Sequence, residues 1–209
     1  MKTFRHALLI GNAKPLTSTE LKPWIQQADF VLAADGGANR ALQAGIRPHA
    51  VIGDLDSVSS RTRQKLPAAS WIFVDNQNNT DLEKSLTYLC THGCKRCTLV
   101  GFSGGRMDFT LGNLLALYPY AGKMDLCVIG DGWKIYPLRK RKTFTVRPGA
   151  RVSLLPLTPC RGVTLTGLEF PLTNTRLPLG TTRTLSNRAV KSRFTVRLQS
   201  GLLLVYVED

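Results

Sequence analysis

The chain has 209 residues, of which 43% are hydrophobic and 20% charged, a composition typical of a folded globular protein. No apolar run approaches the roughly 18 residues that a membrane-spanning helix requires, and Ala7-Leu8-Leu9-Ile10 is too short for the core of a signal peptide. We therefore expect a cytoplasmic protein without a membrane partner. Five cysteines in such a chain indicate free thiols rather than a disulfide framework.

The charge is high and unevenly distributed. Lysine and arginine number 28 against 14 acidic residues, for a net charge of +14. Residues 1–136 carry +4, whereas residues 137–209 carry +10 because they hold only three acidic residues. This asymmetry favours an anionic partner, either a nucleic acid or a phosphorylated small molecule.

The first half alternates short β-rich runs with helical stretches. Helices are predicted to begin near Thr17, Gly37, Ser57, Thr80 and Asp108. The predicted strands are His6–Ile10, Phe30–Ala34, Ala50–Ile52, Trp71–Val74, Thr98–Val100 and Leu126–Ile129. Apolar strands interleaved with helices predict an open, mostly parallel α/β sheet with helices on both faces.

After Asp131-Gly132 the helical signals stop. The following runs are short, alternating and separated by Pro and Gly turns, which predicts a small antiparallel β-sandwich. They are Thr143–Arg147, Arg151–Leu155, Val163–Leu165, Arg193–Leu198 and Leu202–Val207. We therefore predict two domains, residues 1–136 and residues 137–209.

Three segments of the first half join an apolar strand to Asp, Gly and a helix start. They are Ala33–Asn39, Ile52–Ser57 and Gly101–Asp108. In open α/β sheets, ligands bind outside the carboxyl ends of the strands. We expect all three segments to lie on that edge.

Asp54 and Asp56 are two residues apart, which in an extended segment places both carboxylates on one face. Like charges there repel unless a cation lies between them, and oxygen ligands suit Mg²⁺ bound to phosphates. Asp81, beside the helix-capping Thr80, is a candidate third carboxylate. Alternatively, these aspartates occur here only because Asp is common in turns and at helix starts. Three of them together, in a chain with few acidic residues, favour the metal site.

The turn Gly104-Gly105-Arg106 is able to bring backbone N–H groups and a guanidinium to phosphates. It is not a Walker A loop, and by itself it also suits a tight strand-to-helix turn. Asp108 suits either a helix N-cap or a functional role, and Ser57 suits a helix cap.

The motifs, taken together, resemble one family. Five segments occur in the order and approximate spacing of the thiamine pyrophosphokinase family: Ala34–Ala38, Gly53–Ser57, Thr80–Lys84, Gly104–Asp108, and Gly167–Leu172 followed by Leu185-Ser186-Asn187. The resemblance covers nearly the whole chain. Each motif alone is a weak signal, whereas five in order are specific.

The resemblance implies transfer of a diphosphoryl group from ATP to the hydroxyl of thiamine, giving thiamine diphosphate and AMP. It implies Mg²⁺ held by Asp54, Asp56 and Asp81, and homodimers whose active sites lie between the α/β domain of one subunit and the β-domain of the other. Arg106 and Asp108 match positions near the reacting phosphates. The remaining matched positions are implied to bind the nucleotide (Asp35, Gly36, Gly37, Thr80, Lys84, Gly104 and Gly105) or to line the thiamine pocket (Ser186 and Asn187).

This chemistry needs positioning and charge neutralisation more than a covalent intermediate. Asp81 or Asp108 is a candidate acceptor for the hydroxyl proton, and the sequence does not choose between them. Two departures bear on affinity and on selectivity for thiamine. Phe109 stands where many relatives carry a polar residue, and Gly201–Leu204 replaces a stretch in which some relatives carry a tryptophan.

Two alternative functions are less favoured: a pyrophosphokinase acting on another alcohol, and a basic nucleic-acid-binding protein. The run Arg139–Lys142 supports the second, but no aromatic RNA-binding motif accompanies it, and a solvated basic linker is the usual explanation. Cys90, Cys94 and Cys97 have a spacing seen in metal clusters, although helix-end and core positions explain them better.

Overall fold

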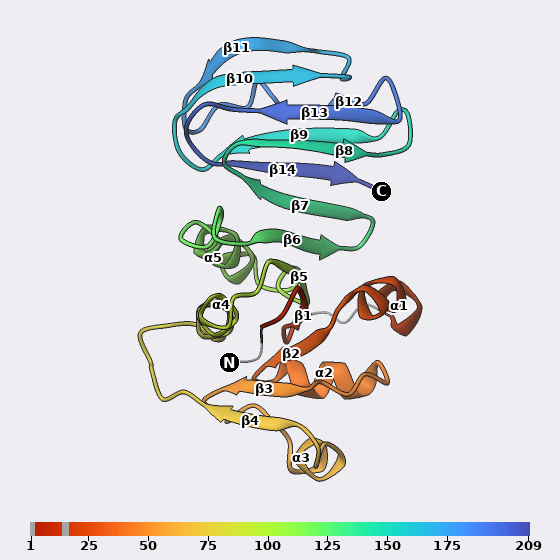
Figure 1. Ribbon diagram of the computed structural model, residues 1–209, viewed down its shortest axis with the longest axis vertical. Helices are drawn as coiled ribbons and strands as arrows, with labels where there is room; N and C mark the ends of the chain where they lie inside the picture. Colours follow the sequence, from red (N-terminus) through yellow and green to blue (C-terminus); the bar gives the residue numbers. More distant parts are fainter. Residues whose placement is uncertain (1–2, 14–16) are drawn as a thin grey trace. The chain divides into compact units, whose positions relative to one another are not determined.

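The computed structural model describes residues 3–13 and 17–209, and the chain forms two compact units, Met1–Gly130 and Asp131–Asp209 (Figure 1). The predicted domain division at residues 136 and 137 lies inside a strand of the second unit, β7 (Trp133–Leu138). Within the described residues, no helix has both the length and the apolar character needed to cross a bilayer.

The first unit is built on a parallel sheet. Its strands follow the spatial order β6-β5-β1-β2-β3-β4, and every neighbouring pair is parallel. They are β1 (His6–Ile10), β2 (Phe30–Ala34), β3 (Ala50–Gly53), β4 (Ser70–Phe73), β5 (Arg96–Val100) and β6 (Asp125–Gly130). All residues of β1, β2 and β3 are buried, as expected for strands covered on both faces.

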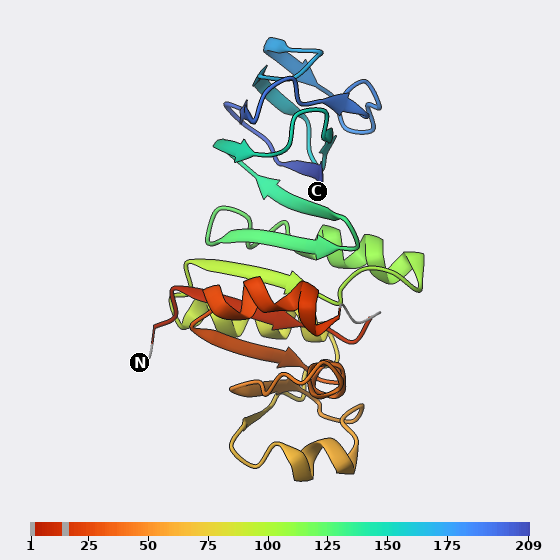
Figure 2. The ribbon, with the colours of Figure 1, turned by 90° about the vertical axis from the view of Figure 1, so that its right-hand side faces the viewer.

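Helices cover both faces of this sheet, as the alternating pattern predicts. The helices are α1 (Ser18–Gln27), α2 (Gly37–Gln43), α3 (Ser60–Lys65), α4 (Asp81–Thr91) and α5 (Met107–Ala116). In Figure 1, α4 and α5 lie on one side of the strands and α1 and α2 on the other; Figure 2 shows the unit after a quarter turn. A Cβ atom at Gly37 would lie 2.1 Å from the carbonyl oxygen of Ile10, so α2 can sit this close to β1 only with glycine there.

The observed helix starts show which local sequence signals predicted them correctly. The T-x-x-E pattern at Thr80 is a capping box, since Thr80 accepts from the Glu83 N–H and the Glu83 carboxylate accepts from the Thr80 N–H. The prediction of a cap at Ser57 is wrong: Ser59 caps α3, while the Ser57 hydroxyl donates to Asp56. Asp108 is not an N-cap either, because α5 begins at Met107 and the Asp108 carboxylate is held by Arg106.

The second unit is a sandwich of antiparallel strands, which confirms the predicted architecture. Within it, one group follows the order β12-β9-β14-β7 and the other β11-β10-β13-β8. Besides β7, the strands are β8 (Arg141–Thr145), β9 (Arg151–Pro156), β10 (Cys160–Thr166), β11 (Leu172–Leu177), β12 (Asn187–Arg188), β13 (Arg193–Arg197) and β14 (Leu203–Glu208). One core cluster joins both groups. In it, Phe144 and Phe194 of one group stack with their ring centres 4.7 Å apart, and Leu154 and Val205 belong to the other group.

The basic run Arg139–Lys142 is part of this unit rather than a linker between domains. Arg139 and Lys140 form the bend after β7, and Arg141 and Lys142 begin β8. The run therefore connects the two strand groups of the sandwich. The sequence alone suggested a linker because the run interrupts the apolar pattern near the change in composition.

Candidate functional site

An open cavity of about 570 Å³ lies at the carboxyl ends of the parallel strands of the first unit. The segments that follow β1, β2, β3 and β5 line it, together with the start of α4 after β4. This is the edge at which an open α/β sheet binds ligands. The lining residues are Gly11, Asn12, Ala13, Ala34, Asp35, Gly36, Arg40, Ser57, Thr80, Asp81, Leu82, Gly101, Phe102, Gly104, Gly105, Arg106, Phe109, Thr110 and Asn113.

Three carboxylates meet at the ends of β2 and β3. Asp35, Asp54 and Asp56 each offer an oxygen, and these oxygens lie within 4.8 Å of one another. Gly53 permits this approach: its φ is +152°, and a Cβ there would lie 2.8 Å from the Cβ of Asp35 and 3.1 Å from Oδ1 of Asp81. Any side chain at this position would push the acidic residues apart.

One oxygen of this group has no partner among the described residues. Asp35 is 5% exposed, and its Oδ1 is buried without a hydrogen bond. Buried carboxylate oxygens are normally satisfied, because leaving one unpaired costs its full desolvation free energy. A divalent cation bound by oxygen ligands would satisfy it, so the residues present fit a Mg²⁺ site.

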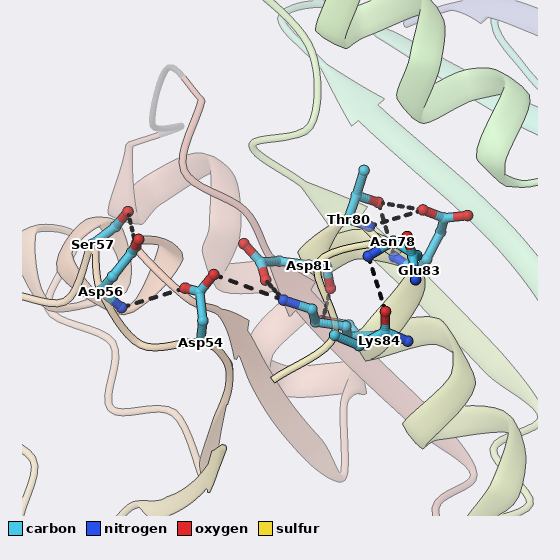
Figure 3. A network of polar contacts seen from close by, with 10 residues as sticks. Asp54, Asp56, Ser57, Asn78, Thr80, Asp81, Glu83 and Lys84 are labelled. Carbon is cyan, nitrogen blue, oxygen red and sulfur yellow. Dashed lines mark hydrogen bonds and ion pairs between the residues drawn. The ribbon is translucent and has the colours of Figure 1, made fainter. Parts of the chain in front are cut away.

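Asp81 lies beside this group but is engaged differently (Figure 3). The ammonium of Lys84 donates to Oδ1 of Asp81 at 3.0 Å and lies 3.9 Å from Oδ2 of Asp54. Burial raises the pKa of Asp81, and the Lys84 hydrogen bond opposes that rise. Lys84, implied by the resemblance to bind the nucleotide, is buried and is not among the residues lining the cavity.

The glycine-rich turn carries an exposed ion pair. Gly104 and Gly105 have φ of +87° and +75°, which L side chains rarely adopt. Arg106 donates to both carboxylate oxygens of Asp108, at 3.2 and 2.6 Å, and its hydrogen bond lowers the pKa of Asp108. The Arg106 guanidinium also lies 4.5 Å from the ring centre of Phe109, so the aromatic side chain that departs from the family pattern stacks on the arginine.

The structure brings most, but not all, of the expected nucleotide-site residues to the cavity. Asp35, Gly36, Thr80, Asp81, Gly104, Gly105 and Arg106 line it. Gly37, Asp54, Asp56, Lys84 and Asp108 do not, although Asp54 and Asp56 lie in the carboxylate group at its edge.

Sequence analysis missed four polar residues of the lining, namely Asn12, Arg40, Thr110 and Asn113. Arg40, on α2, donates to the carbonyl of Asn12 at 3.3 Å, and Asn113, on α5, donates to the carbonyl of Phe102 at 2.9 Å. Asn12 could have been found, because it follows the end of the first strand as Asp35 follows the second. Arg40 and Asn113 lie inside helices, where no local signal marked them.

In the second unit, the buried side chain of Asn187 binds the backbone of Phe170, whose ring is exposed. The Asn187 side-chain amide donates to the carbonyl of Phe170 and accepts from its N–H, at 2.8 and 3.0 Å. The Phe170 side chain is 64% exposed. Ser186 is exposed and adopts a φ of +57°, with its N–H bound to Ser153. Asn187, one of the two predicted thiamine-lining residues, therefore fixes the backbone of an exposed aromatic residue that the sequence alone did not single out.

The cysteines do not form a metal site within the described residues, where the Asp35, Asp54 and Asp56 group is the one set of three or more candidate ligands that converges. All five cysteines are free. Burial raises the pKa of the Cys90, Cys94 and Cys97 thiols, which disfavours the thiolate that binds metals.

Comparisons with known proteins agree across the chain. Residues 21–128 match the family profile "Thiamin pyrophosphokinase, catalytic domain", and residues 139–203 match "Thiamin pyrophosphokinase, vitamin B1 binding domain". The chain is 26% identical to a Bacillus subtilis thiamine pyrophosphokinase over 98% of both chains. It is 28% identical to thiamine pyrophosphokinase 1 of Arabidopsis thaliana, over 95% of this chain and 85% of the relative.

Solved structures share the fold. The crystal structure of a thiamine pyrophosphokinase from Bacillus subtilis superimposes with a TM-score of 0.87 at 23% identity, covering 98% of this chain and 99% of that one. The yeast thiamin pyrophosphokinase superimposes with a TM-score of 0.79 at 20% identity, covering 100% of this chain and 88% of that one.

Proposed function

Because the chain belongs to the thiamine pyrophosphokinase family, we propose that it transfers the diphosphoryl group of ATP to the hydroxyl of thiamine, giving thiamine diphosphate and AMP. The observation that carries the proposal is the buried, unpartnered Oδ1 of Asp35 beside Asp54 and Asp56, next to a glycine-rich turn with an arginine. A site with these groups suits a metal-bound polyphosphate. A pyrophosphokinase acting on another alcohol would use the same groups, so it is the family that favours thiamine as the acceptor. The nucleic-acid-binding alternative is supported by no comparable feature among the described residues.

We propose that Asp35, Asp54 and Asp56 hold Mg²⁺, with Asp81 as a fourth carboxylate of the same cluster. When bound, the ion would supply positive charge to the phosphate oxygens of ATP. The Gly104-Gly105 turn and Arg106 also line the cavity, in which the phosphates would bind. Asp108 and Phe109 orient the Arg106 guanidinium by a bidentate ion pair and a ring contact. These contacts supply positioning and charge neutralisation, on which diphosphoryl transfer depends.

Of the two candidate proton acceptors, Asp81 is better suited. It lines the cavity in which the hydroxyl would meet the phosphates. Asp108 is exposed, engaged by Arg106 through both oxygens, and has a lowered pKa. We therefore assign Asp81 to accept the proton of the attacking hydroxyl.

We assign nucleotide binding to the first unit, Met1–Gly130, and thiamine binding to the second, Asp131–Asp209. Ser186 and Asn187 are the thiamine-lining residues that the resemblance implies, and the exposed Phe170 ring adds an aromatic face for the heterocycles of thiamine. We also propose a homodimer with sites shared between subunits. The apolar helix α5 supports it, since none of its residues is buried.

The test of the function is the stoichiometry of the products from Mg-ATP, with and without thiamine. We expect AMP and thiamine diphosphate in equal amounts, and no AMP when thiamine is omitted. Asp54→Asn should abolish turnover and keep the fold, whereas Asp75→Asn, at an exposed aspartate after β4, should behave as the wild type. Formation of AMP without thiamine would contradict the proposed reaction. Near-normal turnover of Asp54→Asn would contradict the proposed metal site.

A further inference from the structure

Lys84 is a buried lysine whose ammonium lies among carboxylates. Its side chain is 3% exposed, and Nζ contacts Oδ1 of Asp81 at 3.0 Å and Oδ2 of Asp54 at 3.9 Å (Figure 3). Lysine is almost never this buried unless it is paired, because an ammonium removed from water loses its hydration. The two aspartates are therefore what keeps this charge in the interior.

The position of Lys84 is not explained by its helix. Lys84 is in the first turn of α4, where the aligned peptide dipoles disfavour a positive charge. The same turn holds Asp81 and Glu83, which the dipole favours. Lys84 is also absent from the cavity lining. The pair with Asp81 is an i,i+3 contact within the helix, but the burial of the ammonium and its approach to Asp54 are not explained by the helix, whereas the acidic cluster explains both.

We propose that Lys84 is the fixed counter-ion of the cluster formed by Asp35, Asp54, Asp56 and Asp81, and thus a positioning residue. It neutralises Asp81 and Asp54 from the protein side, and it leaves the converging oxygens of Asp35, Asp54 and Asp56 to one divalent cation. The part that concerns the cation rests on the proposed function.

Two positive charges, one permanent and one exchangeable, then stabilise one cluster of four carboxylates and share Asp54. Removing Lys84 increases the repulsion that the divalent ion relieves. The folded state of Lys84→Gln should therefore depend more on Mg²⁺ than the wild-type folded state does. If Lys84 only filled space, the response to Mg²⁺ would be unchanged.

The experiment measures the Tm of the wild type and of Lys84→Gln in EDTA and in saturating Mg²⁺, both without nucleotide. A calorimetric titration measures the affinity of each protein for Mg²⁺. We expect Lys84→Gln to lose stability in EDTA, to regain most of it in Mg²⁺, and to bind Mg²⁺ about tenfold more tightly. A tenfold gain in affinity adds roughly 3–6 °C to the Mg²⁺-induced shift in Tm. Lys95→Gln, at an exposed lysine between α4 and β5, should show the wild-type shift. An equal or smaller shift in Lys84→Gln would overturn the proposal.

A double variant keeps the test decisive if Lys84→Gln does not fold. Lys84→Gln/Asp81→Asn removes one negative charge together with the positive one, so it should be more stable in EDTA than Lys84→Gln alone. A double variant no more stable than the single one would show that Lys84 is not a counter-ion. If the wild type shows no Mg²⁺ response, the metal site of the proposed function fails, while the comparison in EDTA still tests the role of Lys84.

Discussion

Asp81 and Asp108 are both aspartates in the first turn of a helix, yet their surroundings give them opposite properties. Burial raises the pKa of Asp81, whereas the guanidinium of Arg106 lowers the pKa of Asp108. The partner of Asp108 is local, since Arg106 precedes it by two residues, whereas the burial of Asp81 cannot be seen in the sequence around it. The difference arises from what the strands and turns place around each carboxylate.

His6 makes the stability of the fold depend on pH. It is buried in β1, with its ring nitrogens 3.1 Å from the carbonyl of Gln27 and 2.9 Å from the hydroxyl of Thr98. Desolvation by burial, followed by the charge of Arg96, lowers its pKa below 6.5. In the unfolded chain the imidazole gains a proton near pH 6.5, so the contribution of His6 is complete above that pH and is lost as the pH falls through the lowered folded-state pKa.

We therefore expect His6→Gln to destabilise the protein more at pH 7.5 than at pH about 5.5. Urea denaturation of both proteins at the two pH values measures the difference in unfolding free energy. The same destabilisation at both pH values would contradict a neutral, buried imidazole.

Phe170 should affect thiamine binding and little else. Its ring is 64% exposed, so Phe170→Ala should leave the Tm nearly unchanged. An aromatic contact contributes about 0.5–1.5 kcal/mol, which corresponds to an increase of up to roughly tenfold in the KM for thiamine, with little change in the KM for ATP. Phe73→Ala, at the end of β4, is a matched control because that ring is also 64% exposed. If both variants have the same KM for thiamine, Phe170 does not contact the substrate.

Among the helices, α5 is unusual because it is apolar in composition but exposed. It is rich in apolar residues, but none of its residues is buried. The exposed fractions of Met107, Phe109, Leu111 and Leu115 lie between 55% and 69%. An apolar surface of this kind, next to a ligand cavity, is typical of a protein interface.

The proposed homodimer predicts that a charge on α5 will separate the subunits. Leu115→Lys should shift the mass measured by light scattering from dimer to monomer and lower the activity, because a buried lysine in an apolar interface has no counter-charge. Leu179→Lys is the matched control, since Leu179 is 61% exposed and lies in the second unit. A monomeric wild type, or a Leu115→Lys protein that remains fully dimeric, would exclude α5 as the interface.

At the scale of the whole molecule, the net charge of +14 is the dominant electrostatic property. Much of it belongs to the second unit, in which the strands β8, β10, β11 and β13 carry no acidic residue. Arg141 and Arg197 even face each other across β8 and β13. Such a charge attracts anions from a distance and is screened by salt.

ATP and thiamine should therefore respond differently to ionic strength. Raising KCl from about 0.05 to about 0.5 M shortens the screening length severalfold, and we expect the KM for Mg-ATP to rise severalfold with it. The KM for thiamine, which is a cation, should stay constant or fall. Steady-state kinetics with each substrate varied in turn measures both. A KM for Mg-ATP independent of salt would show that the net charge does not assist nucleotide binding.

The sequence by itself determined the two-part architecture, most helix starts and the edge of the sheet where the site lies. Each depends on local physics: the alternation of apolar runs, the reciprocal hydrogen bonds of the Thr80 capping box, and the turn preferences of Asp and Gly. The acidic residues Asp54 and Asp56 could be grouped because two residues of extended chain fix their separation.

Only the tertiary structure decided which side chains share an environment. It placed Asp35 with Asp54 and Asp56, put the ammonium of Lys84 beside Asp54, and brought Arg40 and Asn113 to the cavity. These residues come from different strands and helices, so their distances depend on sheet order and on the space left by Gly53. Local preferences describe the chain within a few residues, whereas desolvation and ion pairing act between segments that meet only after the sheet has formed.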